Sequence, residues 1–215
     1  MYAGRGYRCT ALPDEAAPHR ITLTATEDDD TIGTITVGFD SPAGLHVDEL
    51  FAAETDALRN AGRRLCEFTK LAMDAFVQSK RVLASLFHVA YVCAHRLMGC
   101  DDLLVEVNPR HVRFYERMLG FEVCGPERMN PRVDAPAVLM RLRLTHAREQ
   151  IGRFGGVDEA READRSLYPH FFSRDQEASI FGRLRQRHLS PSPAKVVPSA
   201  PRTAMAASLQ FAQLA

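Results

Sequence analysis

Residues 102–121, DLLVEVNPRHVRFYERMLGF, decide the fold of this chain. They open with an apolar, partly β-branched run that is typical of a short buried strand. Asn108 follows as a helix N-cap, with proline at the first helical position, where its missing N–H has no cost. From His111 the apolar residues recur at three- and four-residue steps, and Gly120 stands where a left-handed C-cap belongs. The stretch therefore predicts a strand, a capped helix and a second strand.

The period of the apolar residues predicts the other elements in the same way. The expected strands are 21–26, 31–37, 64–74, 121–124 and 137–144, and the expected helices are 48–60 and 82–98. Residues 1–19 are expected to be mostly loop, and the acidic run 27–30 to be a solvated hairpin turn. Strict alternation in the strand at 64–74 places Glu67, Thr69 and Leu71 on one face. The strand–helix–strand crossover at 64–107 indicates a mixed α/β sheet.

Composition argues against several classes of protein. Lys plus Arg and Asp plus Glu both number 27, so the formal net charge of zero does not favour nucleic-acid binding. The 5 cysteines have irregular spacings that fit neither a disulfide framework nor a zinc site, and they predict reduced thiols in a cytoplasmic protein. The most apolar helix, 82–98, contains His88, His95 and Arg96, and is too short and too interrupted to span a bilayer. Both histidines are interpreted as structural, and no metal site is predicted.

The chain is expected to have three parts. Residues 1–146 form the main domain, residues 147–189 a helical extension, and residues 190–215 a tail. Within the extension, Ser173 and Gln176 have the spacing of a capping box. The tail is rich in Pro, Ser and Ala and has few large apolar residues, which predicts disorder.

Three segments, taken in order, resemble the long-chain N-acyl amino acid synthase family of the GCN5-related N-acyltransferase (GNAT) superfamily. They are CEFTKLA at 66–72, VLASLFH at 82–88 and the stretch at 107–121, within a resemblance covering roughly residues 2–144. The resemblance implies the GNAT fold, a mixed but mostly antiparallel central sheet flanked by helices, as in the related acyl-homoserine lactone synthases. The superfamily usually begins with a strand and one or two helices. Because 20 residues precede Ile21, the first strand and helix are expected to be missing.

The resemblance also implies an acid–base pair. An amine that attacks a thioester must lose a proton, and Glu67 is expected to take it directly or through water. The leaving thiolate must gain a proton, and Tyr115 is expected to supply it. The structural alternatives are an ion pair of Glu67 with Arg64 or Lys70, and a core Tyr115 whose hydroxyl binds a backbone carbonyl.

The expected donor is an acyl-phosphopantetheine thioester, carried by acyl carrier protein or coenzyme A, with no permanently bound cofactor. The expected contacts are Thr69, Lys70 and Leu71 on the strand, Ser79, Lys80 and Arg81 at one helix start, and Asn108 and Arg110 at the next. Asn108 is interpreted mainly as a helix cap. The segment VLAS at 82–85 lacks the glycines that usually close around the phosphates of coenzyme A. This departure favours acyl carrier protein as the partner.

The predicted function is transfer of a long-chain acyl group, preferably from acyl carrier protein, to the α-amine of a small-molecule amino acid. The predicted protein is cytoplasmic, does not bind nucleic acid and is not integral to the membrane. Two alternatives stay open at this stage: a short-chain acetyl-coenzyme A-dependent N-acetyltransferase, and a non-catalytic binding module with an acyltransferase-like fold.

Overall fold

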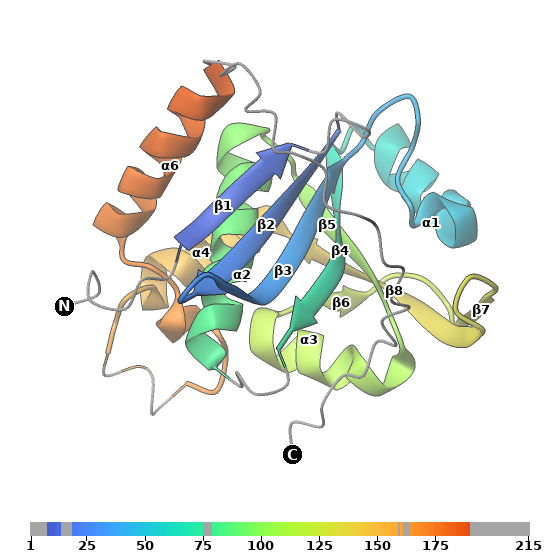
Figure 1. The fold of residues 1–215 in the computed structure, drawn as a ribbon. Helices are drawn as coiled ribbons and strands as arrows, with labels where there is room; N and C mark the ends of the chain where they lie inside the picture. The colour runs from blue at the N-terminus through green and yellow to red at the C-terminus, as the bar shows by residue number, and fades with distance from the viewer. Residues whose placement is uncertain (1–7, 14–18, 75–78, 159, 161–163, 190–215) are drawn as a thin grey trace, which may run out of the picture.

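A single sheet organises the described chain (Figure 1). The computed structural model describes residues 8–13, 19–74, 79–158, 160 and 164–189. The strands are β1 (Arg8–Pro13), β2 (Arg20–Glu27), β3 (Asp30–Phe39), β4 (Leu65–Met73), β5 (Asp102–Val107), β6 (Glu122–Val123), β7 (Arg128–Asn130) and β8 (Ala135–Arg143). Their order is β1-β2-β3-β4-β5-β8-β6, with β7 paired to β8. Within this order β4 and β5 are parallel, and the other neighbouring pairs are antiparallel.

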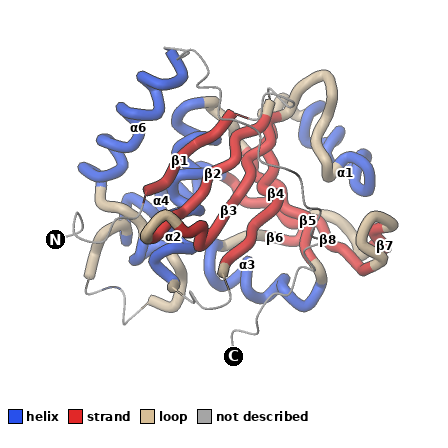
Figure 2. The backbone as a smooth tube through the Cα atoms, viewed as in Figure 1, coloured by secondary structure: helices blue, strands red, loops and turns tan. Residues whose placement is uncertain are grey.

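The helices are α1 (Asp48–Asn60), α2 (Lys80–Tyr91), α3 (Val112–Leu119), α4 (Leu144–Phe154) and α6 (Arg174–Leu189), with a π-helix at Val92–Leu97 and 3₁₀ turns at Pro109–His111 and Tyr168–His170. Figure 2 shows α2 and α4 behind β1, β2 and β3, and α1 on the opposite side of the view from α6. Among the described residues, no helix combines the length and apolar character that a bilayer crossing requires.

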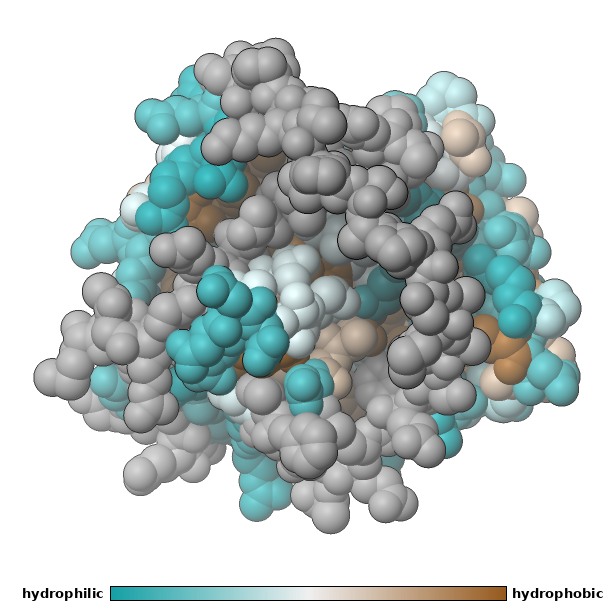
Figure 3. All heavy atoms as spheres, viewed as in Figure 1, coloured by the Kyte–Doolittle hydropathy of each residue, from teal (hydrophilic) through white to brown (hydrophobic). Residues whose placement is uncertain are grey.

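The two faces of the sheet are covered differently. On one face, Leu23 and Leu103 belong to the large core that also contains residues of α2, α3 and α4. On the other face, Leu65 and Leu104 pack with Phe51 of α1 in a smaller core. The part of this second face over β2 and β3 is pale in Figure 3, which marks intermediate hydropathy. The alternation of threonine with apolar residues in β2 and β3 explains this difference between the faces.

The predicted turn and helix caps, which depend on residues close together in the sequence, are confirmed. The hairpin turns at Asp28 and Asp29, whose φ angles are 49° and 69°. Asn108 caps its helix by accepting a hydrogen bond from the Arg110 amide (3.2 Å), and Gly120 ends α3 with φ 78°. The Ser173–Gln176 capping box is confirmed in both directions: the Ser173 amide donates to Gln176 Oε1 (3.0 Å) and the Gln176 amide donates to Ser173 Oγ (3.4 Å).

One element prediction was wrong, and two were right in the type of element but not in its bounds. The N-terminal segment contains β1, which pairs with β2 along its whole length, so a first strand precedes the hairpin. β1 forms because it provides hydrogen-bond partners for the backbone groups at the edge of β2, and the sequence of residues 8–13 alone does not reveal this stabilisation. The last long strand, β8, ends at Arg143 rather than 144. The helix predicted at 82–98 begins at Lys80, because Ser79 caps it, and becomes a π-helix from Val92.

The C-terminal helices pack on the larger core. Leu144 and Ile151 of α4 join this core together with Tyr168 and Phe171. The predicted boundary at 146 therefore falls inside α4, which has core residues on both sides of it. The predicted disordered tail, 190–215, lies outside the described residues.

His88 of α2 links the sheet domain to α6. It is fully buried, its Nδ1 accepts a hydrogen bond from the Phe172 amide (2.9 Å), and its Nε2 lies 3.1 Å from Glu177 Oε2. Since Nδ1 is an acceptor, the ring proton belongs on Nε2, which donates to Glu177. Arg96 also bonds to Glu177, and the ring of Tyr91 lies tilted beside the imidazole, with 6.0 Å between the ring centroids. His88 is thus a structural residue, as interpreted from the sequence.

Acid is expected to loosen this link. Burial lowers the pKa of His88 below its ordinary value of 6.5, an effect that outweighs the opposing hydrogen bond with Glu177. As the pH falls, the unfolded chain therefore binds this proton before the folded protein does. The contribution of the link to the free energy of unfolding is fully present above about pH 6.5 and is lost progressively as the pH falls below that value. Burial by itself would raise the pKa of Glu177, but the bonds from His88 and Arg96 bring it below 4.5, which extends the loss to lower pH.

The measurement is the melting temperature between pH 8 and pH 5. A His88→Gln variant can keep both hydrogen bonds without titrating, because its amide oxygen accepts and its NH₂ donates. The wild-type melting temperature is expected to fall more steeply with acid than that of the variant. Equal slopes would contradict this account of His88.

Candidate active site

The strands β4 and β5 part in the middle of the sheet. Their parallel pairing comprises Leu65 with Asp102, Cys66 with Leu103 and Glu67 with Leu104, although β4 continues to Met73 and β5 to Val107. Beyond Glu67, no other described strand pairs with the facing edges of β4 and β5. Backbone N–H and C=O groups on such an edge can bind an extended ligand that carries amides, or can polarise a carbonyl group.

A β-bulge marks the same part of β4. Thr36 of β3 pairs with Thr69, but Thr34 pairs with Ala72, so Lys70 and Leu71 together oppose one residue of β3. Lys70 takes φ 51° and its carbonyl accepts a hydrogen bond from Thr34 Oγ1 (3.2 Å). After the bulge the alternation is reversed, and Leu71 packs against the larger core. The prediction that Leu71 shares a face with Glu67 was therefore wrong.

Glu67 is the last β4 residue that pairs with β5, and its side chain is fully buried on the α1 face. Its Oε2 accepts a hydrogen bond from the Val47 amide (3.1 Å), just before α1, and its Oε1 accepts one from Arg20 of β2 (3.2 Å). Gly38 lies opposite, and a Cβ there would come within 2.9 Å of Glu67 Oε1. The sequence thus makes space for this carboxylate and supplies it with two donors, which compensate the buried charge.

The ion-pair partner of Glu67 differs from both predicted partners. Arg64 pairs with Asp101 (3.7 Å), and Lys70 is displaced by the bulge. Arg20 lies 47 residues from Glu67 in the sequence, and β2, β3 and β4 must assemble before the two side chains meet.

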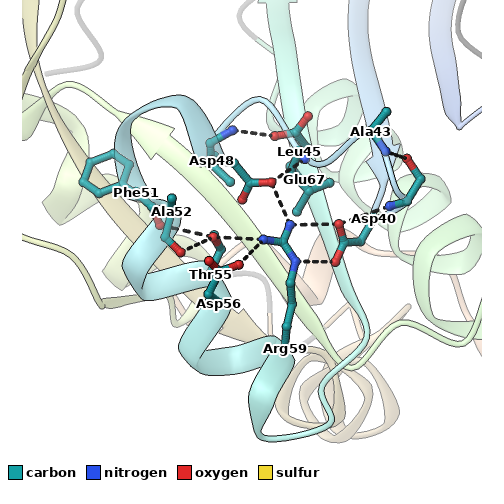
Figure 4. A network of polar contacts seen from close by, with 12 residues as sticks. Asp40, Ala43, Leu45, Asp48, Phe51, Ala52, Thr55, Asp56, Arg59 and Glu67 are labelled. Carbon is teal, nitrogen blue, oxygen red and sulfur yellow. Dashed lines mark hydrogen bonds and ion pairs between the residues drawn. The ribbon is translucent and has the colours of Figure 1, made fainter.

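A second carboxylate–guanidinium network holds the start of α1 (Figure 4). Arg59 donates to both oxygens of Asp40 (2.8 Å each) and to Asp48 Oδ2 (2.7 Å), which also accepts from the Leu45 amide (2.7 Å). Burial by itself would raise the pKa of Asp48, but its bonds to Arg59 and Leu45 bring it below 3.8. Because Glu67 and this network both bind the segment before α1, they fix the loop that borders the site. This network was not predicted from the sequence.

Tyr115 of α3 lies in the larger core, with 6 % of its surface exposed. Its ring meets Phe114 and Phe121 edge to face, each at 5.4 Å between ring centroids. Burial raises its pKa to about 12, so the phenol stays protonated at neutral pH. A different residue, Tyr168, donates its hydroxyl to a carbonyl of this helix end, that of Leu119 (2.7 Å). Tyr115 and Glu67 thus belong to opposite faces of the sheet.

The predicted phosphate-binding residues lie at two helix starts, that of α2 and that of the 3₁₀ turn before α3. Ser79 caps α2 by accepting a hydrogen bond from the Val82 amide (3.4 Å), and Lys80 and Arg81 are exposed. At the other start, Asn108 acts as the cap and the exposed Arg110 donates from Nε to His111 Nε2 (3.1 Å). Residues 75–78, which precede Ser79, lie outside the described residues.

One acidic residue beside the parted strands was not predicted from the sequence. Glu106 of β5 lies two residues after Leu104, which is the partner of Glu67. The signal was present, since a carboxylate within the apolar run 103–107 is the same kind of exception that drew attention to Glu67.

Comparison with solved structures gave several matches, and the match to FeeM agrees with this architecture. The structure of FeeM, an N-acyl amino acid synthase from uncultured soil microbes, matches with 30% sequence identity and a TM-score of 0.57, over 66% of this chain and 84% of that one. A putative GNAT-family acetyltransferase from Desulfovibrio desulfuricans matches with 22% identity and a TM-score of 0.44, over 61% and 72% of the two chains. BjaI, a coenzyme A-dependent acyl-homoserine lactone synthase, matches with 13% identity and a TM-score of 0.46, over 66% and 68%.

Comparison with curated proteins gave no match. The family described as N-acyl amino acid synthase FeeM matches residues 1–143, which is most of the chain. This match confirms the resemblance to the N-acyl amino acid synthase family and identifies the protein as an N-acyltransferase, and the FeeM structure confirms the fold. The chain therefore belongs to the N-acyl amino acid synthase FeeM family.

Proposed function

We propose that this N-acyltransferase moves a long-chain acyl group from acyl carrier protein to the α-amine of an amino acid. The observation that carries the proposal is the parting of β4 and β5 immediately after Glu67, in a chain of the FeeM family. The unpaired edge gives an acyl-phosphopantetheine arm a place to bind. Such donors are cytoplasmic, so the proposal includes a cytoplasmic location.

The donor arm is proposed to lie along β4 between Thr69 and Leu71, where its amides pair with the strand as a short extra strand would. A backbone N–H of the same segment then polarises the thioester carbonyl and stabilises the oxyanion that forms during attack. The bulge at Lys70 supports this placement, because it bends β4 just beyond the last pair of β4 with β5.

The proposed reaction is direct attack of the amine on the thioester. The nitrogen–carbon bond forms, the carbon–sulfur bond breaks, and the proton of the nitrogen passes to Glu67 on the α1 face. The thiolate is proposed to lie in the parting of β4 and β5 and to take the proton of Tyr115 from the other face. A carboxylate has about four lone-pair positions, and the bonds from Arg20 and Val47 occupy two of them. Glu67 therefore keeps acceptor capacity for the amine or for a bridging water.

The choice of carrier follows from the charges at the two helix starts. Coenzyme A adds a pyrophosphate and a 3′-phosphate, which favour a glycine-rich turn, and the sequence has no glycine between 63 and 98. Acyl carrier protein has a single phosphodiester on an acidic surface, which suits exposed basic side chains. Lys80, Arg81, Arg110 and Arg113 are exposed and provide them.

The value of kcat/KM is expected to be higher with dodecanoyl acyl carrier protein than with dodecanoyl-coenzyme A, and the advantage to shrink as salt is raised, because salt screens exposed charges. The double variant Lys80→Glu, Arg81→Glu is expected to remove most of the preference. The matched control, Arg185→Glu with Arg187→Glu on the exposed side of α6, is expected to keep it. Equal or better use of the coenzyme A thioester at low salt would contradict the choice of carrier.

A further inference from the structure

Two polar side chains flank the site where β4 and β5 part. The last pair of the two strands is Glu67 with Leu104, and two residues further along each strand stand Thr69 and Glu106. Side chains two residues apart in a strand share a face. Thr69 of β4 and Glu106 of β5 therefore both lie on the α1 face, next to Glu67 and on either side of the gap between the two strands.

Both side chains have a buried atom without a hydrogen-bond partner among the described residues, Thr69 Oγ1 and Glu106 Oε2. The other Glu106 oxygen accepts a hydrogen bond from Asn130 Nδ2. Buried polar atoms normally have a partner, and leaving one without a partner is costly. Since an ionised carboxylate only accepts hydrogen bonds, the group that completes Glu106 must be a donor.

A cation stands beside Glu106. Arg132, in the turn between β7 and β8, has its Nη2 at 3.7 Å from Glu106 Oε2 and its Nε at 3.3 Å from Glu49 Oε2. The Arg132 and Glu49 side chains are 42% and 57% exposed, and an ion pair this exposed is worth little. A ligand carboxylate can therefore replace Glu49 and bind the guanidinium through two hydrogen bonds.

We infer that Glu106 and Arg132 bind the zwitterionic head of the acceptor, an α-amino acid. Glu106 Oε2 and Thr69 Oγ1 receive its ammonium group, whose N–H bonds are the missing donors, and Arg132 receives its carboxylate. This inference rests on the proposed function and specifies its acceptor. The ammonium held there lies beside Glu67, which takes its first proton and so frees the attacking amine, and beside the β4 edge proposed for the thioester. The second proton, lost when the amide forms, passes to bulk water.

The test measures thiol release from dodecanoyl acyl carrier protein with L-phenylalanine and with its methyl ester, which keeps the amine but lacks the carboxylate. Arg132→Gln is expected to raise the KM for phenylalanine at least about tenfold while changing the KM for the ester less than twofold, on the scale of a lost charge-assisted bond. Glu106→Gln is expected to raise both KM values by a similar factor. Glu49→Gln, the matched control, removes the other partner of Arg132 and is expected to raise neither.

General damage to the fold would raise both KM values in Arg132→Gln as well, so the selective loss for the free acid is the deciding result. KM values within twofold of wild type in Glu106→Gln, or equal changes for acid and ester in Arg132→Gln, would overturn the inference. If the wild-type enzyme acylates neither compound, the proposed acceptor fails in this assay. Equilibrium binding of phenylalanine and of its ester to the protein, measured by NMR, then tests the subsite. Arg132→Gln must weaken the binding of phenylalanine and not that of the ester. Wild-type protein that binds neither compound would overturn the inference.

Discussion

Replacing Glu67 with glutamine is expected to lower kcat by about 10²-fold or more, the usual scale for the loss of a general base. Glutamine has nearly the same shape and its amide oxygen can still accept the hydrogen bond of the Val47 amide, but it cannot take a proton at neutral pH. The fold is expected to survive, because the Arg20 side chain is 18% exposed and can be hydrated when its partner loses its charge. Circular dichroism and the melting temperature check the fold, and steady-state thiol release gives kcat.

Glu54→Gln is the matched control for this substitution. Glu54 also pairs with an arginine, Arg128, at 2.7 Å, and its side chain is 18% exposed. The control removes one carboxylate charge and weakens one ion pair, but it lies outside the proposed site and should leave kcat near the wild-type value. Wild-type turnover by a correctly folded Glu67→Gln protein would show that Glu67 is only a structural anchor for the start of α1.

Replacing Tyr115 with phenylalanine is expected to lower kcat by about 10²-fold as well, because the leaving thiolate then lacks its proton donor. Since burial raises the pKa of Tyr115 to about 12, the phenol keeps its proton through pH 10, and its ionisation should cause no loss of activity below that pH. Tyr168→Phe is the control. It removes the hydroxyl bond to Leu119 at a cost of about 1 kcal/mol in the free energy of unfolding, and should leave kcat unchanged.

A thioester with a different leaving group can distinguish a role of Tyr115 in proton transfer from a role in packing. A dodecanoyl thioester of thionitrobenzoate releases a stabilised thiolate that needs no proton, so it should restore most of the lost rate in Tyr115→Phe. An equal loss of rate with both thioesters would mean that the substitution disturbs the core around Phe114 and Phe121, and would contradict a role in proton transfer.

What could be predicted from the sequence was decided by residues close together in the chain. Asn108 and Gly120 enforce their caps through contacts within a few residues, so the strand, helix and strand around them followed from local chemistry. Glu67 could be singled out because a carboxylate is rare in an apolar strand. The family resemblance added the fold and the reaction class, and the match over residues 1–143 confirmed both.

What could not be predicted depends on strand register and on distant partners. The bulge at Lys70 arises from the pairing of β3 with β4, and no residue type at 70 or 71 demands it. The partner of Glu67 comes from β2, and the partner of His88 comes from α6, 89 residues away. β1 is short, and its pairing with β2 gives its backbone groups partners that its own sequence does not reveal. Such contacts exist only once the chain has folded, and a local pattern does not encode them.

The most direct test of the central claim is the product itself. The purified protein is incubated with dodecanoyl acyl carrier protein and each of the twenty amino acids, and the products are identified by mass spectrometry while free thiol is counted. The account predicts an N-dodecanoyl amino acid, formed in a one-to-one ratio with released thiol and reduced about 10²-fold in rate by Glu67→Gln. Thiol release without an acylated amino acid, or transfer from acetyl-coenzyme A in preference to the long-chain donor, would contradict it.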